Sequence, residues 1–239
     1  MTIAWRAGER GVTRLRFSLP DGAEIIANVE RLLLTGYSGR DEADIAAHLA
    51  EMASLGVAGP DTVPVFHPAM SCLLTQGDTV EAVGPDSRPE IEFVLFEVNG
   101  ARFVTLGNDQ FDLATEQHCS AVKSKSLCQK LVARNAWLLS QVSGHWDELV
   151  LELRSGATLL QSSAVSAILP PDRLMADAMR QRGFRRERGM LFSGTVPMLR
   201  PIEADMREFS MALRDPVLGR AIGCDFHVED ITKLPLIDG

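Results

Sequence analysis

Residues 90–107, EIEFVLFEVNGARFVTLG, decide the fold of this chain. Apolar residues fill both halves of the stretch, and Asn99 with Gly100 stands between the halves. Asn-Gly is a preferred two-residue connection between antiparallel strands. The stretch therefore predicts a β-hairpin made of two apolar strands.

Three carboxylates lie at the open end of this hairpin. Glu90 and Glu92 are two residues apart, so a strand places both on one face. The short turn returns Asp109 close to the level of Glu90. Two like charges on such an apolar strand are unfavourable unless a cation shares them. The pattern predicts that oxygens of the three carboxylates coordinate Mg²⁺ or Mn²⁺ on one side. The alternative is a strand at the edge of a sheet whose charged side chains are solvated and prevent pairing with another strand.

The rest of the chain contains more strand signals than helix signals. Pro20, Asp21 and Gly22 mark a turn between strand-like runs, and Ser155 with Gly156 marks a second hairpin. The order is not a regular βαβ alternation, which favours an α+β fold that is predominantly β. The predicted elements are strands within 13–36, a helix over 41–55, the hairpin 90–107, a hairpin over 146–163, a helix over 170–183, a short buried strand within 189–197, and a tail that mixes a helix over 203–215 with strand-like segments.

The composition is that of a soluble globular protein. The chain has 239 residues, of which 46% are hydrophobic and 23% charged, enough for one large domain or two small ones. Its net charge is −8, with 24 Lys and Arg against 32 Asp and Glu. Nucleic acid and anionic membranes require a basic face, so neither is expected as a partner. A small anionic substrate needs only local positive charge or a metal.

Motifs for several common activities and locations are missing. The four cysteines form no C-x-x-C pair and fit no zinc spacing, as expected for thiols in a reducing compartment. The N-terminus lacks an apolar core of signal-peptide length, and we expect a cytoplasmic protein. No P-loop, G-x-G-x-x-G or G-x-S-x-G pattern occurs, which argues against nucleotide kinases, simple Rossmann enzymes and serine hydrolases.

A histidine and a glutamate lie on the predicted helix 41–55. His48 and Glu51 are three residues apart and are therefore neighbours on the helix. A carboxylate beside an imidazole raises its basicity, which suits a general base acting on water. Gly36 and Gly39 in the preceding loop would let the helix close over a site as a lid. The alternative is a His-Glu pair on the solvent-exposed face of an amphipathic helix.

Two lysines follow the hairpin. Either Lys123 or Lys125 could hold a substrate carboxylate or enolate, and the sequence does not choose between them. The alternative is a pair of exposed lysines in a loop.

These motifs follow one another in an order that resembles the fumarylacetoacetate hydrolase superfamily, over roughly residues 30 to 230. No single motif is specific, and the order carries the resemblance. The similar segments are LTGYSGRDEADIAAHLAEM (34–52), VPVFHPAMSC (63–72), PEIEFVLFEV (89–98), LGNDQFDLATEQ (106–117), KSKSLC (123–128) and GMLFSGTVP (189–197).

The resemblance implies a role for each candidate residue. It implies one domain over 1–239 with a mixed β-sandwich or roll, in which 1–60 supply N-terminal strands and a short lid helix and 61–239 a metal-binding β-rich core. The implied metal ligands are Glu90, Glu92 and Asp109; the implied catalytic residues are His48, Glu51 and Lys125; and the implied substrate contacts are Lys123, His67, Tyr37, Gly194 and Thr195.

The implied activity is that of a metal-dependent hydrolase that cleaves a C–C bond in a small oxo-acid, such as an acylpyruvate or a fumarylacetoacetate-like compound. Decarboxylation, isomerisation or dehydration on the same metal site is one alternative, and a non-catalytic ligand-binding protein is another. The resemblance also implies a homodimer. The chain departs from the pattern on the substrate side, which suggests an outlying branch, such as a bacterial domain family of unknown function. The departures are Gly36 in place of Asn, His67 in place of Lys, Phe111 and Asp112 in place of Ser and Arg, and an inserted Val196.

Overall fold

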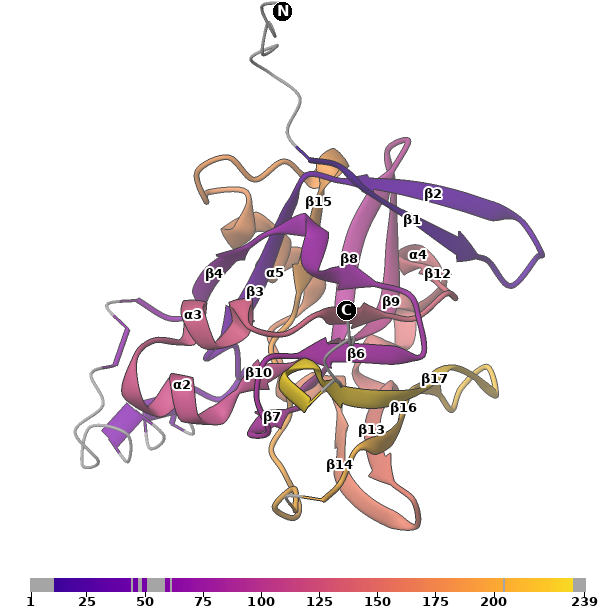
Figure 1. Ribbon diagram of the computed structural model, residues 1–239. Coiled ribbons are helices and arrows are strands. Elements are labelled where there is room, and N and C mark those ends of the chain that lie inside the picture. The colour runs from indigo at the N-terminus through magenta and orange to yellow at the C-terminus, as the bar shows by residue number, and fades with distance from the viewer. Residues whose placement is uncertain are drawn as a thin grey trace, which may run out of the picture.

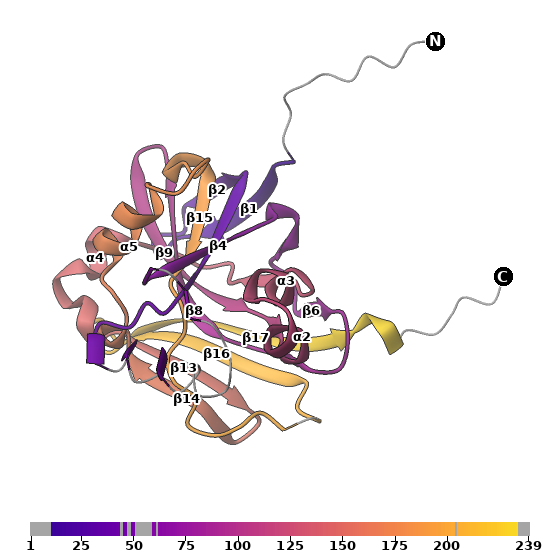
Figure 2. The ribbon, with the colours of Figure 1, turned by 90° about the vertical axis from the view of Figure 1, so that its left-hand side faces the viewer.

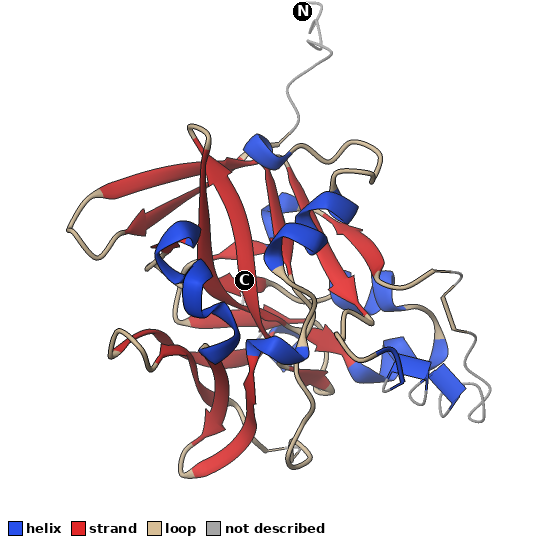
Figure 3. Cartoon of the chain, turned by 180° about the vertical axis from the view of Figure 1, so that it is seen from behind, coloured by secondary structure: helices blue, strands red, loops and turns tan. Residues whose placement is uncertain are grey.

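The computed structural model describes residues 11–43, 45–46, 49–50, 59–60, 62–203 and 205–233. More of these residues lie in strands than in helices, as Figure 3 shows, so the predicted α+β, predominantly β class is confirmed. Within the described ranges, no helix is long and apolar enough to cross a membrane.

The larger sheet is mixed and contains the predicted hairpin at its centre (Figure 1). Strands β3 (Arg31–Gly36) and β15 (Gly189–Phe192) pair in parallel, although they are far apart in the sequence. In spatial order the strands are β4 (Val65–Ala69), β3 (Arg31–Gly36), β15 (Gly189–Phe192), β8 (Ile91–Val98), β9 (Ala101–Asp109), β11 (Lys130–Val132) and β5 (Leu74–Thr75), with β12 (Trp137–Leu138) also paired to β9.

The second sheet packs against one face of the first. In spatial order its strands are β14 (Thr158–Ala164), β13 (Val150–Ser155), β16 (Glu208–Asp215), β17 (Arg220–Asp230) and β6 (Thr79–Ala82). Two small antiparallel pairs complete the strands: β1 (Thr13–Ser18) with β2 (Glu24–Val29), and β7 (Ser87–Arg88) with β10 (Phe111–Asp112).

The helices are short, as Figure 2 shows. The α-helices are α2 (Leu113–His118), α3 (Ala121–Ser126), α4 (Leu139–Val142) and α5 (Pro171–Ala178). The 3₁₀ helices are η1 (Ser71–Leu73), η2 (Ser143–Glu148), η3 (Val165–Ala167), η4 (Arg186–Arg188) and η5 (Ile231–Lys233).

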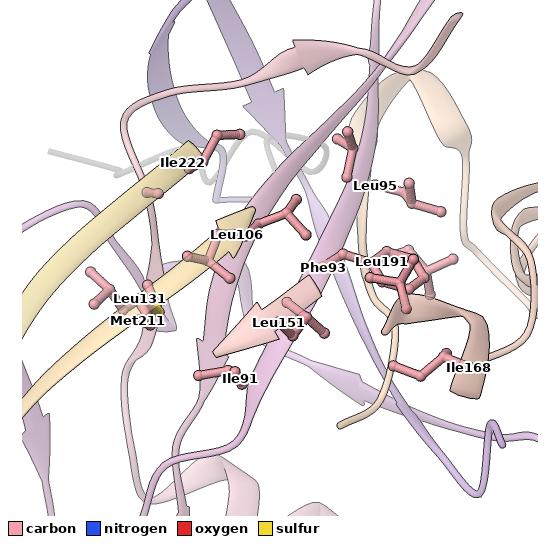
Figure 4. Close-up of a cluster of buried hydrophobic side chains, with 14 of the residues drawn as sticks. Ile91, Phe93, Leu95, Leu106, Leu131, Leu151, Ile168, Leu191, Met211 and Ile222 are labelled. Atoms are coloured by element: carbon pink, nitrogen blue, oxygen red, sulfur yellow. The ribbon is translucent and has the colours of Figure 1, made fainter. Parts of the chain in front are cut away.

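Strand β8 is buried on both faces, which explains why apolar residues fill it apart from Glu92 and Glu97. Ile91, Phe93 and Leu95 belong to the core between the two sheets, together with residues of β13, β16 and β17 (Figure 4). On the opposite face, Phe96 stacks on Phe17 of the β1–β2 hairpin at 4.4 Å between ring centroids. Because side chains alternate along the strand, Glu92 lies on the same face as Phe96, the face opposite to the core between the two sheets.

Two predicted helices differ from the observed elements, and a third is described only in part. The predicted helix 203–215 is wrong, because 208–215 is strand β16 between β13 and β17. Its residues favour helix locally, but alternate side chains are buried between the sheets, and this packing prevails. Helix α5 ends at Ala178, earlier than the predicted end at 183. Of the predicted helix 41–55, the described residues 42–43, 45–46 and 49–50 are helical.

Candidate active site

The register of the central hairpin brings the three predicted carboxylates together. Ile91 pairs with Asn108, so Glu90 lies opposite Asp109, and the Asp109 N–H donates to the Glu90 carbonyl at 2.9 Å. One oxygen from each of Glu90, Glu92 and Asp109 lies within 4.8 Å of the other two. The interatomic distances are short enough for one divalent cation to contact all three residues.

Two of these carboxylates are fully buried. Glu92 and Asp109 have no exposed surface, whereas the Glu90 side chain keeps 26% of its own. Glu92 Oε2 accepts a 2.7 Å hydrogen bond from the Gly194 N–H, but Oε1 has no hydrogen-bond partner within the described part of the chain. Burial, and then the charge of Asp109, raise the pKa of Glu92 well above its usual value. A buried oxygen without a donor is costly, and its position in an acidic cluster fits a cation.

Gly194 is required where it stands. Its φ is +85°, and a Cβ there would collide with the Ser38 side chain and approach the Thr35 carbonyl to 3.0 Å. Ser38 is itself fixed, because its hydroxyl donates to the Ser193 carbonyl at 2.6 Å. Glycine thus lets the chain turn so that its N–H points at Glu92.

Helix α3 separates the two candidate lysines. Lys125 Nζ donates to Glu90 Oε2 at 2.9 Å and to Asp109 Oδ2 at 2.6 Å, and it is buried. Lys123 is exposed, since residues two apart on a helix point in different directions. The structure therefore resolves the choice that the sequence left open: Lys125 faces the carboxylates.

A second buried lysine, Lys130 on β11, was missed by the sequence analysis. Its Nζ lies 2.7 Å from Asp109 Oδ1 and donates to the Gln110 carbonyl. Burial alone would raise the pKa of Asp109, but Lys125 and Lys130 hold it below its usual value. The available signal was a lysine before the apolar run Leu131–Val132, within a strand that proves to be buried.

Three polar side chains border the cluster. His67 on β4 is half-buried, and burial together with the Lys125 charge lowers its pKa, so the ring is neutral at pH 7. Glu116 on α2, also missed from the sequence, has its pKa raised by burial and then by the charge of Glu90. Tyr37 has its pKa raised by burial and then by Glu116. These shifts show that all three side chains are in electrostatic range of the cluster or of one another.

The other predicted substrate contacts hold the strands in place. The Thr195 hydroxyl donates to the Ile91 carbonyl at 2.8 Å and accepts from Gln161 Nε2 at 2.9 Å. The Gly194 N–H is used by Glu92. Both residues therefore position the strand that carries the carboxylates, and their contact with a substrate stays a prediction.

The predicted His48–Glu51 pair lies outside the described residues. The preceding loop can be described, and it is fixed rather than free. The Ser38 carbonyl accepts from the Leu169 N–H at 2.8 Å, and the Arg40 N–H donates to the Ala167 carbonyl at 2.8 Å. A hinge at Gly36 and Gly39 would have to break these bonds.

Comparisons with known proteins agree with this architecture. A family model described as protein of unknown function (DUF2848) matches residues 35–226. The search of curated proteins gave no match.

Three similar solved structures illustrate the fold. Fumarylpyruvate hydrolase from Pseudomonas aeruginosa, in complex with Mn²⁺ and pyruvate, has a TM-score of 0.63 at 17% identity, covering 93% of this chain and 97% of its own. The 5-carboxymethyl-2-hydroxymuconate delta-isomerase from Mycobacterium smegmatis has a TM-score of 0.57 at 14% identity, and the match covers 90% of this chain and 98% of the isomerase. A 2-keto-3-deoxy-D-arabinonate dehydratase has a TM-score of 0.59 at 14% identity, and the match covers 85% of this chain and 76% of the dehydratase. The predicted fumarylacetoacetate hydrolase-type fold is confirmed.

Proposed function

The chain belongs to the DUF2848 family, and we propose that it is a divalent-metal-dependent enzyme that cleaves a C–C bond in a small oxo-acid. The observation that carries this proposal is the convergence of Glu90, Glu92 and Asp109, with one buried Glu92 oxygen that has no donor among the residues that the structure describes. Structures with the same fold, named as a hydrolase, an isomerase and a dehydratase, support an oxo-acid enzyme in general.

The three carboxylates are the proposed metal ligands. Carboxylate oxygens suit the hard cations Mg²⁺ and Mn²⁺. A bound cation would act as a Lewis acid toward the carbonyl oxygen of an oxo-acid. The Mn²⁺ in the fumarylpyruvate hydrolase complex supports a divalent ion here but does not distinguish Mn²⁺ from Mg²⁺.

The lysines have different proposed roles. Lys130 is enclosed and fixes Asp109 in one orientation. Lys125 Nζ lies beside the carboxylates, where its ammonium can donate to an anionic oxygen of a bound oxo-acid. Tyr37 and His67 are proposed to orient the substrate, and the His48–Glu51 pair is proposed to take the proton from the attacking water. A cytoplasmic location and a homodimer stay predictions.

Metal binding provides the first test. Titration of the metal-free protein with Mn²⁺, followed by calorimetry and electron paramagnetic resonance, should show one site per chain. The double variant Glu90→Gln/Glu92→Gln should lose that site, whereas Glu208→Gln, a change at an exposed position of β16, should keep it. Unchanged Mn²⁺ stoichiometry in the double variant would refute the ligand assignment.

Product analysis then identifies the reaction. In ¹⁸O-labelled water a hydrolase incorporates the label at the carbonyl that water attacks, whereas an isomerase only exchanges protons. His48→Ala should slow turnover and leave Mn²⁺ bound. Tight Mn²⁺ binding without turnover of any oxo-acid tested would instead support a non-catalytic binding protein.

A further inference from the structure

A cavity separate from the candidate active site lies at the turn end of the central hairpin. It has a volume of about 630 Å³ and is lined by residues of β9, α4, η2 and the start of α5. Arg102 lines it, and Asp109 lies at the far end of the same strand, so roughly 20 Å separate the cavity from the candidate metal ligands. Helix α4 lies away from α3, the helix that carries Lys125, in both Figure 1 and Figure 2.

Apolar side chains form one wall of this cavity. They include Leu138, Leu139, Pro171 and Trp146, and all but Leu138 are buried. The Trp146 ring is held in place by an edge-to-face contact with Phe93, with 4.9 Å between the ring centroids. An ordered and largely apolar wall of this kind suits the hydrocarbon part of a small molecule.

His145 adds a hydrogen-bonding group to the cavity. Its Nε2 is buried and lies 3.0 Å from Oδ1 of the fully enclosed Asp215. A carboxylate beside Nε2 keeps the proton on that nitrogen, so Nδ1 of the neutral ring is an acceptor. His145 lines the cavity, and Nδ1 forms no hydrogen bond with another described residue. The cavity therefore offers an acceptor to a ligand that carries a donor.

Two ion pairs border the cavity and cancel their own charges. Arg40 donates to both carboxylate oxygens of Asp147, each at 2.8 Å, and Arg102 pairs with Asp172. The third nitrogen of Arg40, Nε, donates to the Ile168 carbonyl at 3.3 Å. Neither pair leaves a net charge for a ligand.

Glu148 leaves the cavity with a surplus negative charge. It lies at the exposed rim on η2, and no ion pair joins it to another described residue. Asp215, behind His145, is cancelled by Arg220, whose Nε lies 3.0 Å from Oδ2. An acceptor at His145 Nδ1 and a surplus carboxylate at Glu148 together favour a ligand group that is both a donor and a cation.

We propose that this cavity is a second binding site, for a small organic amine with an apolar body. The ammonium group donates to His145 Nδ1 and is attracted by Glu148. The apolar body packs against Leu139 and Trp146. The site lies away from the three carboxylates, so its ligand does not depend on the metal chemistry proposed above.

Three probes with the same aromatic body and different charges test this site. At pH 8, 2-phenylethylamine is a cation, 2-phenylethanol is neutral and 3-phenylpropanoate is an anion. Dissociation constants are measured at low salt on the full-length chain, from NMR shifts of the Trp146 indole N–H, which Trp146→Phe identifies. The amine should bind about fivefold more tightly than the alcohol, and the acid should bind most weakly.

Glu148→Gln removes the charge at an exposed position and keeps the shape. The amine and the alcohol should then bind within about twofold of each other, with alcohol binding and the melting temperature unchanged. Glu208→Gln is the matched control and should keep the wild-type preference. Failure of all three probes to shift the Trp146 signal, or a wild-type preference retained in Glu148→Gln, would refute the site.

Ser140→Phe tests the location of binding. Ser140 lines the cavity from an exposed position on α4, so a phenyl ring there fills the cavity without entering the core. The variant should no longer bind any of the three probes. Binding with wild-type dissociation constants would place the probes elsewhere and overturn the proposal.

Discussion

Two buried carboxylate clusters in this molecule differ in their charge balance. At the end of β16, Asp215 is buried and fully partnered. Its Oδ1 accepts from the Leu218 N–H at 3.0 Å and lies 3.0 Å from His145 Nε2, and its Oδ2 accepts from Arg220 Nε at 3.0 Å. Arg220 in turn lies over the Trp137 ring at 4.5 Å. One acid has two side-chain partners and a backbone donor, so this cluster holds the fold together.

The cluster at the β8–β9 hairpin has an excess of acid. Among the described residues, Lys125 pairs with Glu90 and Asp109, and Lys130 pairs with Asp109. Glu92 accepts a hydrogen bond from the Gly194 N–H through Oε2, and its Oε1 has no donor in the described part of the chain. A balanced buried cluster serves stability, whereas an unbalanced one costs stability until a ligand arrives. This difference in charge balance distinguishes Asp215, which stabilises the fold, from the candidate metal ligands Glu90, Glu92 and Asp109.

The largest effect is expected from Lys130→Met. Lys130 and Asp109 are both fully buried, so the change leaves a buried charge with one partner fewer. The free energy of unfolding should fall by about 4 kcal/mol. Urea denaturation measures this, and Lys130→Met/Asp109→Asn should recover most of the loss. A single variant as stable as the wild type would show that Lys130 does not compensate Asp109.

Asp215→Asn should have a smaller effect and lower the free energy of unfolding by about 2 kcal/mol. Asn keeps one oxygen acceptor, but the charge-assisted bonds to His145 and Arg220 are lost. Mn²⁺ binding should not change, since Asp215 belongs to the balanced cluster. A weakened Mn²⁺ site in this variant would contradict the separation of the two clusters.

The pH dependence of that loss can also be predicted. Burial alone would raise the pKa of Asp215, but hydrogen bonds from Leu218, His145 and Arg220 hold it below its usual value. Its contribution to stability is therefore fully present above the unfolded pKa of about 3.9 and is lost as the pH falls through the folded pKa. In urea denaturation, the difference between the wild type and Asp215→Asn should begin to shrink as the pH falls below about 4.

Glu92→Gln should stabilise the metal-free protein, whereas the two preceding substitutions destabilise it. Glutamine still accepts from the Gly194 N–H and removes a surplus buried charge. Without metal, the free energy of unfolding should rise by about 1 kcal/mol, while Mn²⁺ affinity falls at least about 100-fold. Loss of stability in the metal-free variant would show that Glu92 is compensated in a way the two-cluster comparison does not include.

The smallest effect is expected from Glu208→Gln. Glu208 pairs with His227 at 2.7 Å, but the glutamate side chain is 78% exposed and solvent screens the pair. The free energy of unfolding should change by no more than about 0.5 kcal/mol. A larger change would mean that exposed pairs on β16 also support the fold.

The hairpin and its carboxylates were predictable because they depend on local geometry. A two-residue turn fixes which residues face each other, and strand alternation fixes which side chains share a face. Glu90, Glu92 and Asp109 therefore meet as their spacing predicts. The helix over 203–215 failed because its residues favour helix locally, while pairing with β13 and β17 is a long-range effect.

The sequence by itself determined the central hairpin, the predominantly β class and the convergence of three acids. Only the tertiary structure decided that Lys125 rather than Lys123 meets them, that Lys130 pairs with Asp109, and that Gly194 donates to Glu92. These three contacts join segments separated in the sequence. Their geometry is set by how the sheets and helix α3 pack, and residue spacing alone carries no information about that packing.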